Sequence, residues 1–426
     1  MEKNDRKPEI RFSGFETAWQ KKCFGDEFDI LSNNTLSREF LNYDQGIAKN
    51  VHYGDVLIKF NEYLDASKEV LPYIEDEKVI DKFQNSFLRD GDIVIADTAE
   101  DETVGKCTEI GQIRDLPIIA GLHTMPCRPK GKYAPKYLGY YLNADAYHRE
   151  LLPLMQGVKV TSISRSGVKD TDIIVSEEYD EQKKIGQYLF TLDEKIKFEK
   201  DKLDRLIILK KSMLEKMFPQ GNSKVPEIRF GKYTDEWEQR KLSEFVDKAV
   251  DNRGKTPPLD ENGTHPLIEV AALGGVHPDY TKVEKYLNDN SFENNLRAYI
   301  KEGDILFTTV GSIGLVSLMD SREEAAIAQN IVAFRAKENY VPEYLYALFS
   351  NEDNHYKATR IVMGAVQPSI KVSQLVDVEY MLTENVEEQT KIGAYFSNLD
   401  NLITFHQRKV DKLKNIKSSC MDKMFV

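Results

Sequence analysis

Long hydrophobic runs and closely spaced cysteines are both missing from this sequence. Across its 426 residues no apolar stretch approaches the roughly 20 residues needed to cross a bilayer, so we expect no membrane span. The residues that follow Met1 are polar or charged, and we therefore expect no signal peptide. The four cysteines lie far apart without a CxxC pair, which argues against a zinc site or a disulfide framework and indicates free thiols in the cytoplasm.

Catalytic and ligand-binding motifs are also scarce. Residues 254–256 are Gly-Lys-Thr, but Ala249 occupies the position where a phosphate-binding loop needs glycine. No GxGxxG follows a predicted strand, and HExxH and GxSxG do not occur. The pair Pro257 and Pro258 lacks the flanking residues that orient an exocyclic amine for methyl transfer. We therefore expect no catalytic centre, no bound cofactor and no metal site in this chain, and we expect a packing role for His123.

Basic residues are outnumbered by acidic ones. The sequence has 58 lysines and arginines against 70 aspartates and glutamates, which gives a formal net charge of −12. A strongly basic chain, the usual mark of a nucleic-acid-binding protein, is therefore excluded. Any contact with nucleic acid must depend on local patches or on a partner protein.

An internal repeat is the strongest signal in the sequence. The pentapeptide Pro-Glu-Ile-Arg-Phe occurs at residues 8–12 and again at 226–230, an offset of 218. The block Glu-Gln-x-Lys-Ile-Gly-x-Tyr occurs at 181–188 and 388–395, and its offset of 207 holds to the C-terminus. The chain therefore contains two copies of one unit of about 210 residues.

The falling offset places insertions and deletions early in each copy, while the later part keeps its register. This pattern suggests a constant frame that carries a variable recognition part. A duplication that simply drifted is the alternative, but drift would not preserve residues 181–218 so well.

The conserved block of each copy predicts a long helix. Residues 181–218 contain no proline, and eight of the ten a and d heptad positions are apolar in each copy. Each helix would be roughly 50 Å long at 1.5 Å per residue. We expect the two helices to pair antiparallel, with paired positions summing to about 610; separate packing on the two domains is the alternative. The predicted seam consists of Ile185, Leu189, Leu192, Ile196, Glu199, Leu203, Leu206, Ile392, Phe396, Leu399, Ile403, His406, Val410 and Leu413.

Two polar residues interrupt the middle of this seam. In an antiparallel pair, Glu199 and His406 fall within one to two turns of each other, and an unpaired polar group there is costly. We predict that they approach each other or share a polar cluster with Asp204 or Asp411, which would fix the register. Side chains that extend to solvent are the alternative.

The variable part of each copy predicts a mixed domain. Short apolar runs after Gly-Asp turns, at residues 54–58, 91–96 and 303–307, indicate buried strands. The expected fold class is α+β, with two β-rich domains joined by two long antiparallel coiled-coil helices and related by an internal pseudo-twofold repeat. The predicted segments are domain 1 at 1–180, a central helix at 181–220, domain 2 at 221–386 and a C-terminal helix at 387–426.

The repeated helices, together with short motifs in the variable domains, resemble the specificity subunits of type I restriction–modification enzymes. The motifs are Asp-Asn-Arg-Gly-Lys-Thr-Pro-Pro at 251–258, His-Tyr-Gly-Asp at 52–55, Gly-Ser-Ile-Gly at 311–314 and Ala-Gln-Asn-Ile at 328–331. The resemblance covers essentially the whole chain. It implies that each domain is a target-recognition domain for one half of a split, asymmetric site in double-stranded DNA.

The resemblance also implies partners. The helices would act as a spacer and as the docking site for two methyltransferase subunits, which bind S-adenosylmethionine and methylate adenine. Restriction subunits with ATP and magnesium would join them to cut DNA. This chain itself would be a non-catalytic cytoplasmic protein.

Candidate DNA contacts follow from polar residues in Gly- and Pro-rich segments, because such segments form exposed loops and Arg is a common base or phosphate contact. The two copies differ here: Leu122 and His123 stand where the second copy has Gln329 and Asn330. Ordinary surface or turn residues are the alternative for each candidate. The candidates are Lys49, His52, Lys59 and Lys159 in domain 1, and Arg253, Lys255, Gln329, Asn330 and Gln367 in domain 2.

Two other functions fit the pattern. One is a coiled-coil scaffold whose domains bind proteins without DNA contact. The other is a stand-alone regulator that binds a bipartite DNA site. A footprint with two protected patches would exclude the scaffold, and binding without a methyltransferase would favour the regulator.

Overall fold

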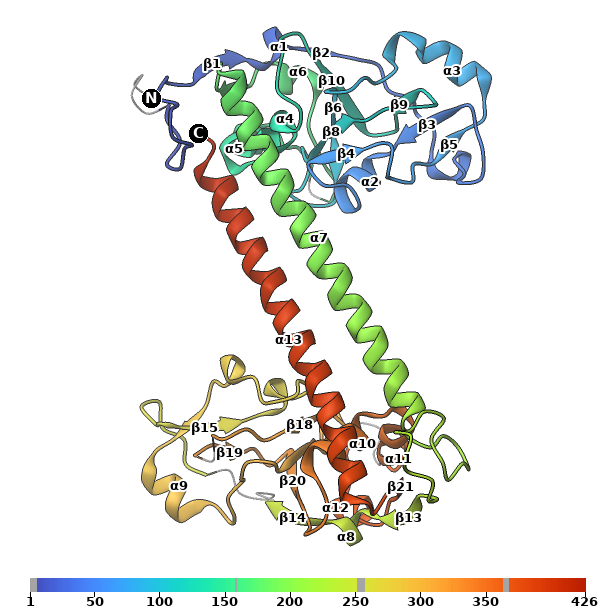
Figure 1. Ribbon diagram of the computed structural model, residues 1–426. Helices are drawn as coiled ribbons and strands as arrows, with labels where there is room; N and C mark the ends of the chain where they lie inside the picture. Colours follow the sequence, from blue (N-terminus) through green and yellow to red (C-terminus); the bar gives the residue numbers. More distant parts are fainter. Residues whose placement is uncertain (1–5, 158, 251–256, 323, 363–367) are drawn as a thin grey trace. The chain divides into compact units, whose positions relative to one another are not determined.

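The chain forms two compact units, each described separately below (Figure 1). Unit 1 comprises Met1–Glu199 and Lys409–Val426, and unit 2 comprises Lys200–Arg408. The division falls inside the two long helices, so each unit contains a segment of both. The computed structural model describes residues 6–157, 159–250, 257–322, 324–362 and 368–426.

Unit 1 contains short strands and helices besides its segments of the long helices. Its strands are β1 (Gln20–Cys23), β2 (Phe28–Ile30), β3 (Ala48–Val51), β4 (Tyr63–Asp65), β5 (Tyr73–Ile74), β6 (Ile93–Ala96), β7 (Thr98–Ala99), β8 (Cys107–Gly111), β9 (Ile118–Ala120), β10 (Thr124–Pro129), β11 (Thr161–Ser162) and β12 (Asp172–Val175). Its short helices are α1 (Phe24–Glu27), α2 (Tyr53–Ile58), α3 (Glu77–Phe83), α4 (Tyr137–Asn143), α5 (Asp145–Leu151) and α6 (Arg165–Lys169).

The main sheet of unit 1 is mixed. Its order is β2-β10-β6-β8-β4, in which β4 runs parallel to β8 and the other neighbours are antiparallel. A second sheet has the order β5-β3-β9, and the strands also form the pairs β1-β12 and β11-β7.

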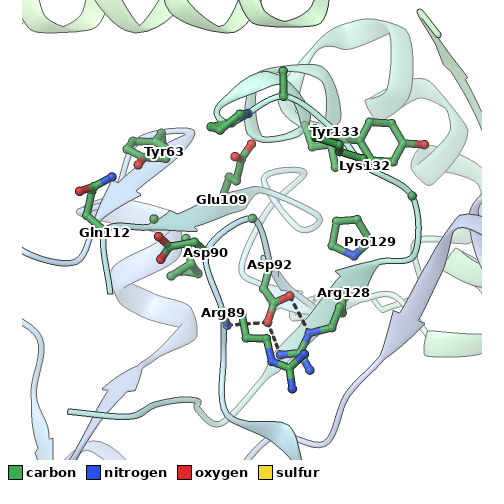
Figure 2. A pocket seen from close by; sticks show the side chains of 17 residues that line it. Tyr63, Arg89, Asp90, Asp92, Glu109, Gln112, Arg128, Pro129, Lys132 and Tyr133 are labelled. Carbon is green, nitrogen blue, oxygen red and sulfur yellow. Dashed lines mark hydrogen bonds and ion pairs between the residues drawn. The ribbon is translucent and has the colours of Figure 1, made fainter. Parts of the chain in front are cut away.

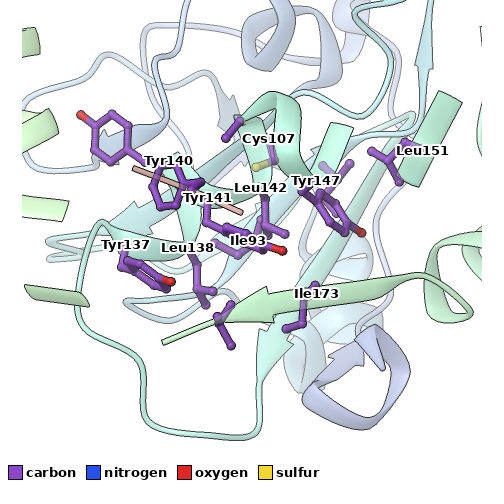
Figure 3. Packing of buried hydrophobic residues seen from close by; sticks show 14 of the residues in the cluster. Ile93, Cys107, Tyr137, Leu138, Tyr140, Tyr141, Leu142, Tyr147, Leu151 and Ile173 are labelled. Atoms are coloured by element: carbon purple, nitrogen blue, oxygen red, sulfur yellow. The ribbon is translucent and has the colours of Figure 1, made fainter. Parts of the chain in front are cut away.

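Alternate residues of β6 face two cores, because successive side chains of a strand point to opposite faces of the sheet. Ile93 and Ile95 pack against the tyrosines of α4, including Tyr141 (Figure 3). Val94 and Ala96 face the second core with residues of β8 and β9. All four side chains are buried, and each large apolar one stabilises the fold by roughly 1.5–3 kcal/mol.

Unit 2 repeats this design with a smaller set of strands. Its strands are β13 (Glu238–Lys241), β14 (Val246–Val250), β15 (His265–Ile268), β16 (Tyr286–Leu287), β17 (Ile305–Thr308), β18 (Val316–Leu318), β19 (Ala326–Ile327), β20 (Ile331–Ala336) and β21 (Glu379–Leu382). Its short helices are α8 (Leu242–Phe245), α9 (Asp289–Asn295), α10 (Pro342–Ser350), α11 (Glu352–Thr359) and α12 (Val372–Leu375). The sheets have the orders β14-β20-β17-β18, β16-β15-β19 and β13-β21.

The central strand β17 corresponds to β6. Ile305 and Phe307 face a core shared with α10, whereas Leu306 faces the other core. Both units therefore place a sheet between a helix-covered core and a second, smaller core, which confirms the predicted α+β class and the internal repeat.

The two long helices are α7 (Tyr179–Lys216) and α13 (Val386–Lys423). Within unit 1, Lys417 Nζ lies 2.7 Å from Asp193 Oδ1, and within unit 2, Lys210 Nζ lies 2.6 Å from Asp400 Oδ1. Both pairs of residue numbers sum to 610, so each unit pairs its segments of α7 and α13 antiparallel in the predicted register. Each pair of segments also packs on its own domain. Leu189 of α7 lies in the core that contains α4, and Phe396 of α13 lies in the core that contains α10.

The fourteen predicted seam residues are all buried or half-buried. Glu199, at 6 % exposure, accepts a hydrogen bond of 2.8 Å from Lys409 Nζ, a partner that the sequence analysis did not name. His406 is half-buried in unit 2 with its ring beside that of Phe405. The proposed approach of Glu199 to His406 joins residues of different units and stays a prediction.

The repeated sequence blocks meet in space. Arg11, from the pentapeptide, donates two hydrogen bonds of 2.5 and 2.9 Å to the carboxylate of Glu181, at the start of α7. Arg229 donates in the same way to Glu388, with bonds of 2.6 and 2.9 Å. Both glutamates are fully buried, so a bidentate partner is required to offset their desolvation.

The other residues of the helix block also have structural roles. Gln182 accepts a hydrogen bond from Ala134 N, and Gln389 accepts one from Val341 N, so each glutamine binds the segment that leads into α4 or α10. At Gly186, a Cβ atom would lie 3.0 Å from the backbone just before α4. The block therefore fixes the long helix to its domain, and this explains its preservation in both copies.

Candidate nucleic-acid interface

Polar side chains gather in unit 1 where β6 ends and β10 begins. Asp97 N donates to His123 O at 3.1 Å, which joins the two strand ends. Thr98 Oγ1 donates to Asp97 Oδ1 at 2.9 Å and lies 3.3 Å from His123 Nδ1. The ring of Tyr53 packs edge-on against the His123 ring, with centroids 5.2 Å apart. We call Tyr53, Asp97, Thr98 and His123 rim 1.

Lys159 lies in the segment that leads into β11. Gln156 and Ser162 form an antiparallel β-bridge, and β11 places Ser162 opposite Thr98. Lys159 is exposed between them. The strand that follows this predicted DNA contact is thus paired with Thr98 of rim 1.

Unit 2 has an equivalent surface. Thr309 N donates to Asn330 O at 2.8 Å, the counterpart of the Asp97–His123 bond. Ile370 N donates to Thr309 O at 2.9 Å, just as Ile163 N donates to Asp97 O at 3.0 Å. Val310 forms an antiparallel β-bridge with Ser369, and Gln329 is exposed beside Asn330 in the sequence. We call this set of residues rim 2: Thr309, Val310, Gln329, Asn330 and Ser369.

The two histidines near rim 1 differ in exposure. His52 is only 6 % exposed, and its Nδ1 accepts a hydrogen bond of 3.2 Å from Gly54 N at the start of α2. Burial, followed by the nearby Arg38 guanidinium, lowers the pKa of His52. It therefore caps α2 behind Tyr53, and its DNA contact stays a prediction. His123, for which we expected a packing role, has a side chain that is 46 % exposed.

The remaining candidates lie apart from the rims or outside the described residues. Lys49 is half-buried in β3 beside a small cavity of about 150 Å³. Lys59 is exposed, and its Nζ donates to Val70 O at 2.7 Å. Arg253, Lys255 and Gln367 fall outside the residues that the structure describes, so their DNA contacts stay predictions.

Tyr53, Asp97 and Thr98 were not among the predicted DNA contacts, although Tyr53 belongs to the His-Tyr-Gly-Asp motif at 52–55. A Gly-Asp turn followed by an apolar run predicted β6 correctly, and the first polar residues after this run mark the strand end. The same pattern at residues 54–58 predicted a strand, which is wrong, because these residues form α2 (Tyr53–Ile58). The signal at β6 would have found Asp97 and Thr98. No local signal connects them with His123, because the contact is made through sheet pairing.

A pocket beside the main sheet of unit 1 lies away from rim 1, at the other end of β6 (Figure 2). It has a volume of about 370 Å³, and Asp92 and Arg128 form an ion pair of 2.6 Å in its wall. Glu109 is buried there and accepts hydrogen bonds from Lys136 N and Gly139 N at 2.5 and 3.0 Å. Burial raises the pKa of Glu109 to about 7. The carboxyl group fixes the start of α4 and has a structural role.

The described part of the chain holds no group of three or more His, Cys, Asp or Glu side chains arranged for a metal ion. Among the same residues, no helix is long and apolar enough to cross a membrane.

The chain is similar to known proteins of one family. Residues 234–415 match the family model described as "Type I restriction modification DNA specificity domain". The chain is 24 % identical over 253 residues to the type I restriction enzyme MjaVIII specificity subunit of Methanocaldococcus jannaschii, covering 57 % of this chain and 59 % of that protein. It is 27 % identical over 219 residues to the putative MjaX specificity subunit of the same organism, covering 50 % of each. The matches thus span about half the length of these curated relatives.

Two solved structures share the fold. The S subunit of a type I restriction–modification system from M. genitalium superposes with a TM-score of 0.64, at 14 % identity and 99 % coverage of both chains. A chain from a study of type I restriction–modification complex assembly and conformational transition gives 0.51, at 16 % identity, covering 98 % of this chain and 99 % of that one. Residues 234–415 thus match the specificity domain of type I restriction–modification systems, and the whole chain shares the fold of their S subunits.

Proposed function

We propose that this chain recognises a split, asymmetric site in double-stranded DNA, with each unit binding one half-site. The observation that carries the proposal is the pair of equivalent rims, which present different side chains from the same backbone positions. His123 in rim 1 stands where Asn330 stands in rim 2, and both are joined by the same backbone hydrogen bond to the preceding strand end. Different side chains on one scaffold are what an asymmetric site requires.

The proposal includes partners. The chain has no catalytic role of its own and docks methyltransferase subunits, which bind S-adenosylmethionine, and restriction subunits, which use ATP and magnesium. The names of the relatives support this assignment, since they are specificity subunits of type I restriction enzymes. Basic partners would supply part of the phosphate contact that dominates affinity, which is consistent with the net charge of −12.

The test is to map DNA methylation in cells that express the full-length chain with its methyltransferase subunit. We expect modified adenines in one bipartite sequence and none when this chain is omitted. Methylation without a sequence preference would overturn the proposal and favour a scaffold. Sequence-specific binding that does not require the methyltransferase would favour the stand-alone regulator.

A domain exchange sharpens the test. Replacing residues 1–175 with the same region of a related specificity subunit should change one half of the methylated sequence and leave the other half unchanged. The matched control exchanges the equivalent region of unit 2, which should change the opposite half. Changes in both halves after either exchange would contradict separate recognition by the two units.

A further inference from the structure

We propose that His123 determines part of the half-site recognised by unit 1, by accepting a hydrogen bond at Nε2 from the exocyclic amine of adenine or cytosine. This inference rests on the proposed function and assigns one specific contact to it. It reverses the packing role that the sequence favoured for this residue.

The backbone of His123 is held in an unusual conformation. Its φ of 52° lies in the left-handed region, which is uncommon for residues other than glycine and costs of order 1 kcal/mol. The surrounding turn is fixed, because Asp97 N binds His123 O and Thr124 Oγ1 donates to Gly121 O at 2.5 Å. Gly121 is needed there, since a Cβ atom would lie 2.3 Å from Asn50 Oδ1. A strained residue that its neighbours hold firmly is a candidate for function.

Hydrogen bonds select the tautomer of the His123 ring. The single proton of the Thr98 hydroxyl goes to Asp97 Oδ1, because a carboxylate can only accept. The Thr98 oxygen must therefore accept from His123, which places the ring proton on Nδ1. Asp97 Oδ1, 3.6 Å from Nδ1, favours the same arrangement. In the neutral ring Nε2 then carries a lone pair, and it has no hydrogen-bond partner among the described residues.

The ring is also fixed in position. Tyr53 packs edge-on against it, and the ring of His52 lies 4.7 Å from that of Tyr53, centroid to centroid. His52 is itself held as the cap of α2. The side chain of His123 nevertheless remains 46 % exposed. A fixed acceptor on an exposed surface loses little conformational freedom on binding, which favours both affinity and discrimination.

An acceptor selects bases that carry a donor. In the major groove these donors are N6 of adenine and N4 of cytosine, whereas guanine and thymine present acceptors. Asn330 in rim 2 has an amide that can both accept and donate, which suits N6 and N7 of adenine. The same backbone position therefore predicts different preferences in the two half-sites.

The experiment uses the full-length chain assembled with its methyltransferase subunit and a DNA library with both half-sites randomised. His123→Gly removes the ring and His123→Asn shortens it, and both residues tolerate a positive φ. We expect the wild type to select adenine or cytosine at one position of one half-site, and His123→Gly to lose that selection alone. Asn330→Gly is the matched control and should relax only the opposite half-site.

A base analogue isolates the hydrogen bond. Replacing the selected base by its counterpart without the exocyclic amine should weaken binding of the wild type by roughly 5- to 100-fold, the range of one good base contact. The same replacement should leave binding of His123→Gly nearly unchanged.

The outcomes separate this inference from the proposed function. If the wild type selects a bipartite site and His123→Gly selects it equally well, the inference is wrong and the proposed function stands. Selection of guanine at the position that depends on His123 would overturn the acceptor assignment. If the wild-type assembly selects no sequence at all, the proposed function and this inference both fail.

Discussion

Within each unit the two long helices are joined by equivalent Lys–Asp pairs, and the surroundings of these pairs differ between the units. In unit 1, Lys417 Nζ lies 2.7 Å from Asp193 Oδ1 and donates to both carboxylate oxygens of Glu62 at 2.9 and 2.8 Å. In unit 2, Lys210 Nζ donates to Asp400 at 2.6 Å. The offset of 207 relates the two Lys–Asp pairs, but Glu62 comes from the variable part of unit 1.

The hydrogen bonding of the second carboxylate oxygen, Oδ2 of Asp193 or Asp400, differs between the units as well. Tyr140 OH donates to Asp193 Oδ2 at 2.5 Å. In unit 2 the corresponding residue of the sequence repeat is Ala347, and Asp400 Oδ2 is buried without a hydrogen-bond partner among the described residues. Duplication thus kept the central ion pair, while each domain supplied its own surrounding groups.

The same contrast occurs at the buried glutamates. Glu181 accepts from Trp19 Nε1 at 3.1 Å in addition to its arginine, whereas Trp237 Nε1 is buried without a partner among the described residues. At these two sites, therefore, unit 1 supplies hydrogen-bond partners to buried polar groups whose counterparts in unit 2 have none among the described residues. The two tryptophans, one in each unit, allow unfolding of each unit to be followed by fluorescence when the other is replaced by phenylalanine.

The largest expected effect comes from removing the buried carboxylates. We expect Glu181→Ala to reduce the free energy of unfolding of unit 1 by about 3–5 kcal/mol, because the Arg11 guanidinium is left buried and unpaired. Glu388→Ala should have a similar but smaller effect on unit 2, since one fewer donor loses its partner. Urea unfolding followed by Trp19 or Trp237 fluorescence measures each unit. Asp180→Ala, at an exposed position of the same helix, should cost no more than about 0.5 kcal/mol.

The second prediction concerns replacement of the equivalent lysines, Lys417 in unit 1 and Lys210 in unit 2. Lys417→Met leaves two neighbouring carboxylates unpaired and should destabilise unit 1 by about 2–4 kcal/mol, whereas Lys210→Met leaves one and should cost about half as much. Burial raises the pKa of Asp193, as does the nearby Glu62. The cost of Lys417→Met should therefore be smaller at pH 5 than at pH 8, because protonation removes the unpaired charge. Lys414→Met, at an exposed position of α13, is the control. Equal costs for the two lysines would contradict the proposed contrast.

A pH difference between the units follows from Glu109. Leu318 takes its place in unit 2, since Glu109 pairs with Ile93 and Leu318 pairs with Ile305. Burial raises the pKa of Glu109 to about 7, above its value in the unfolded chain, so the folded state binds this proton more tightly. Its contribution to stability is fully present below about pH 4.5 and is lost as the pH rises to about 7.

Replacement by a neutral residue tests this effect. The stability cost of Glu109→Gln, measured through Trp19 in urea, should fall by up to about 3 kcal/mol between pH 4.5 and 8, because only the wild type loses stability on ionisation. Unit 2, followed through Trp237, should show no response to the substitution. A cost that does not change with pH would mean that Glu109 is already ionised at pH 5.

The sequence predicted the helices and the repeat because those signals are local or periodic. The seam positions follow heptads, and a sum of 610 places Asp193 opposite Lys417. The identity of the partners did not follow, since Lys417 and Lys210 sit at d positions that a heptad pattern treats as simple interruptions. The heptad pattern also did not predict that Lys409 pairs with Glu199. A long lysine side chain from the flank of a helix can reach a buried carboxylate.

The candidate interface was harder to predict than the frame. His52 and His123 look alike in sequence, but sheet pairing puts one behind Tyr53 and the other at the rim. Lys159 was chosen for its charge, and only the pairing of β11 with β7 places the strand that follows it beside Thr98. Contacts that depend on which strands pair, and in which register, cannot be obtained from residue types along the chain.

The smallest expected effect concerns the tyrosine that unit 2 lacks. Tyr140→Phe removes the donor to Asp193 Oδ2 and so reproduces in unit 1 the unsatisfied oxygen of Asp400. A hydrogen bond to a charged group contributes roughly 1.5–3 kcal/mol, and we expect a loss near the lower value because Lys417 still holds the carboxylate. Tyr188→Phe, whose hydroxyl lies 4.0 Å from Cys420 Sγ, is the matched control and should cost less than about 0.5 kcal/mol. In a double-mutant cycle with Lys417→Met the two losses should not be additive, since both act on Asp193. Additive losses would mean that Tyr140 and Lys417 stabilise unit 1 independently, and the contrast with unit 2 would then reduce to the ion pair alone.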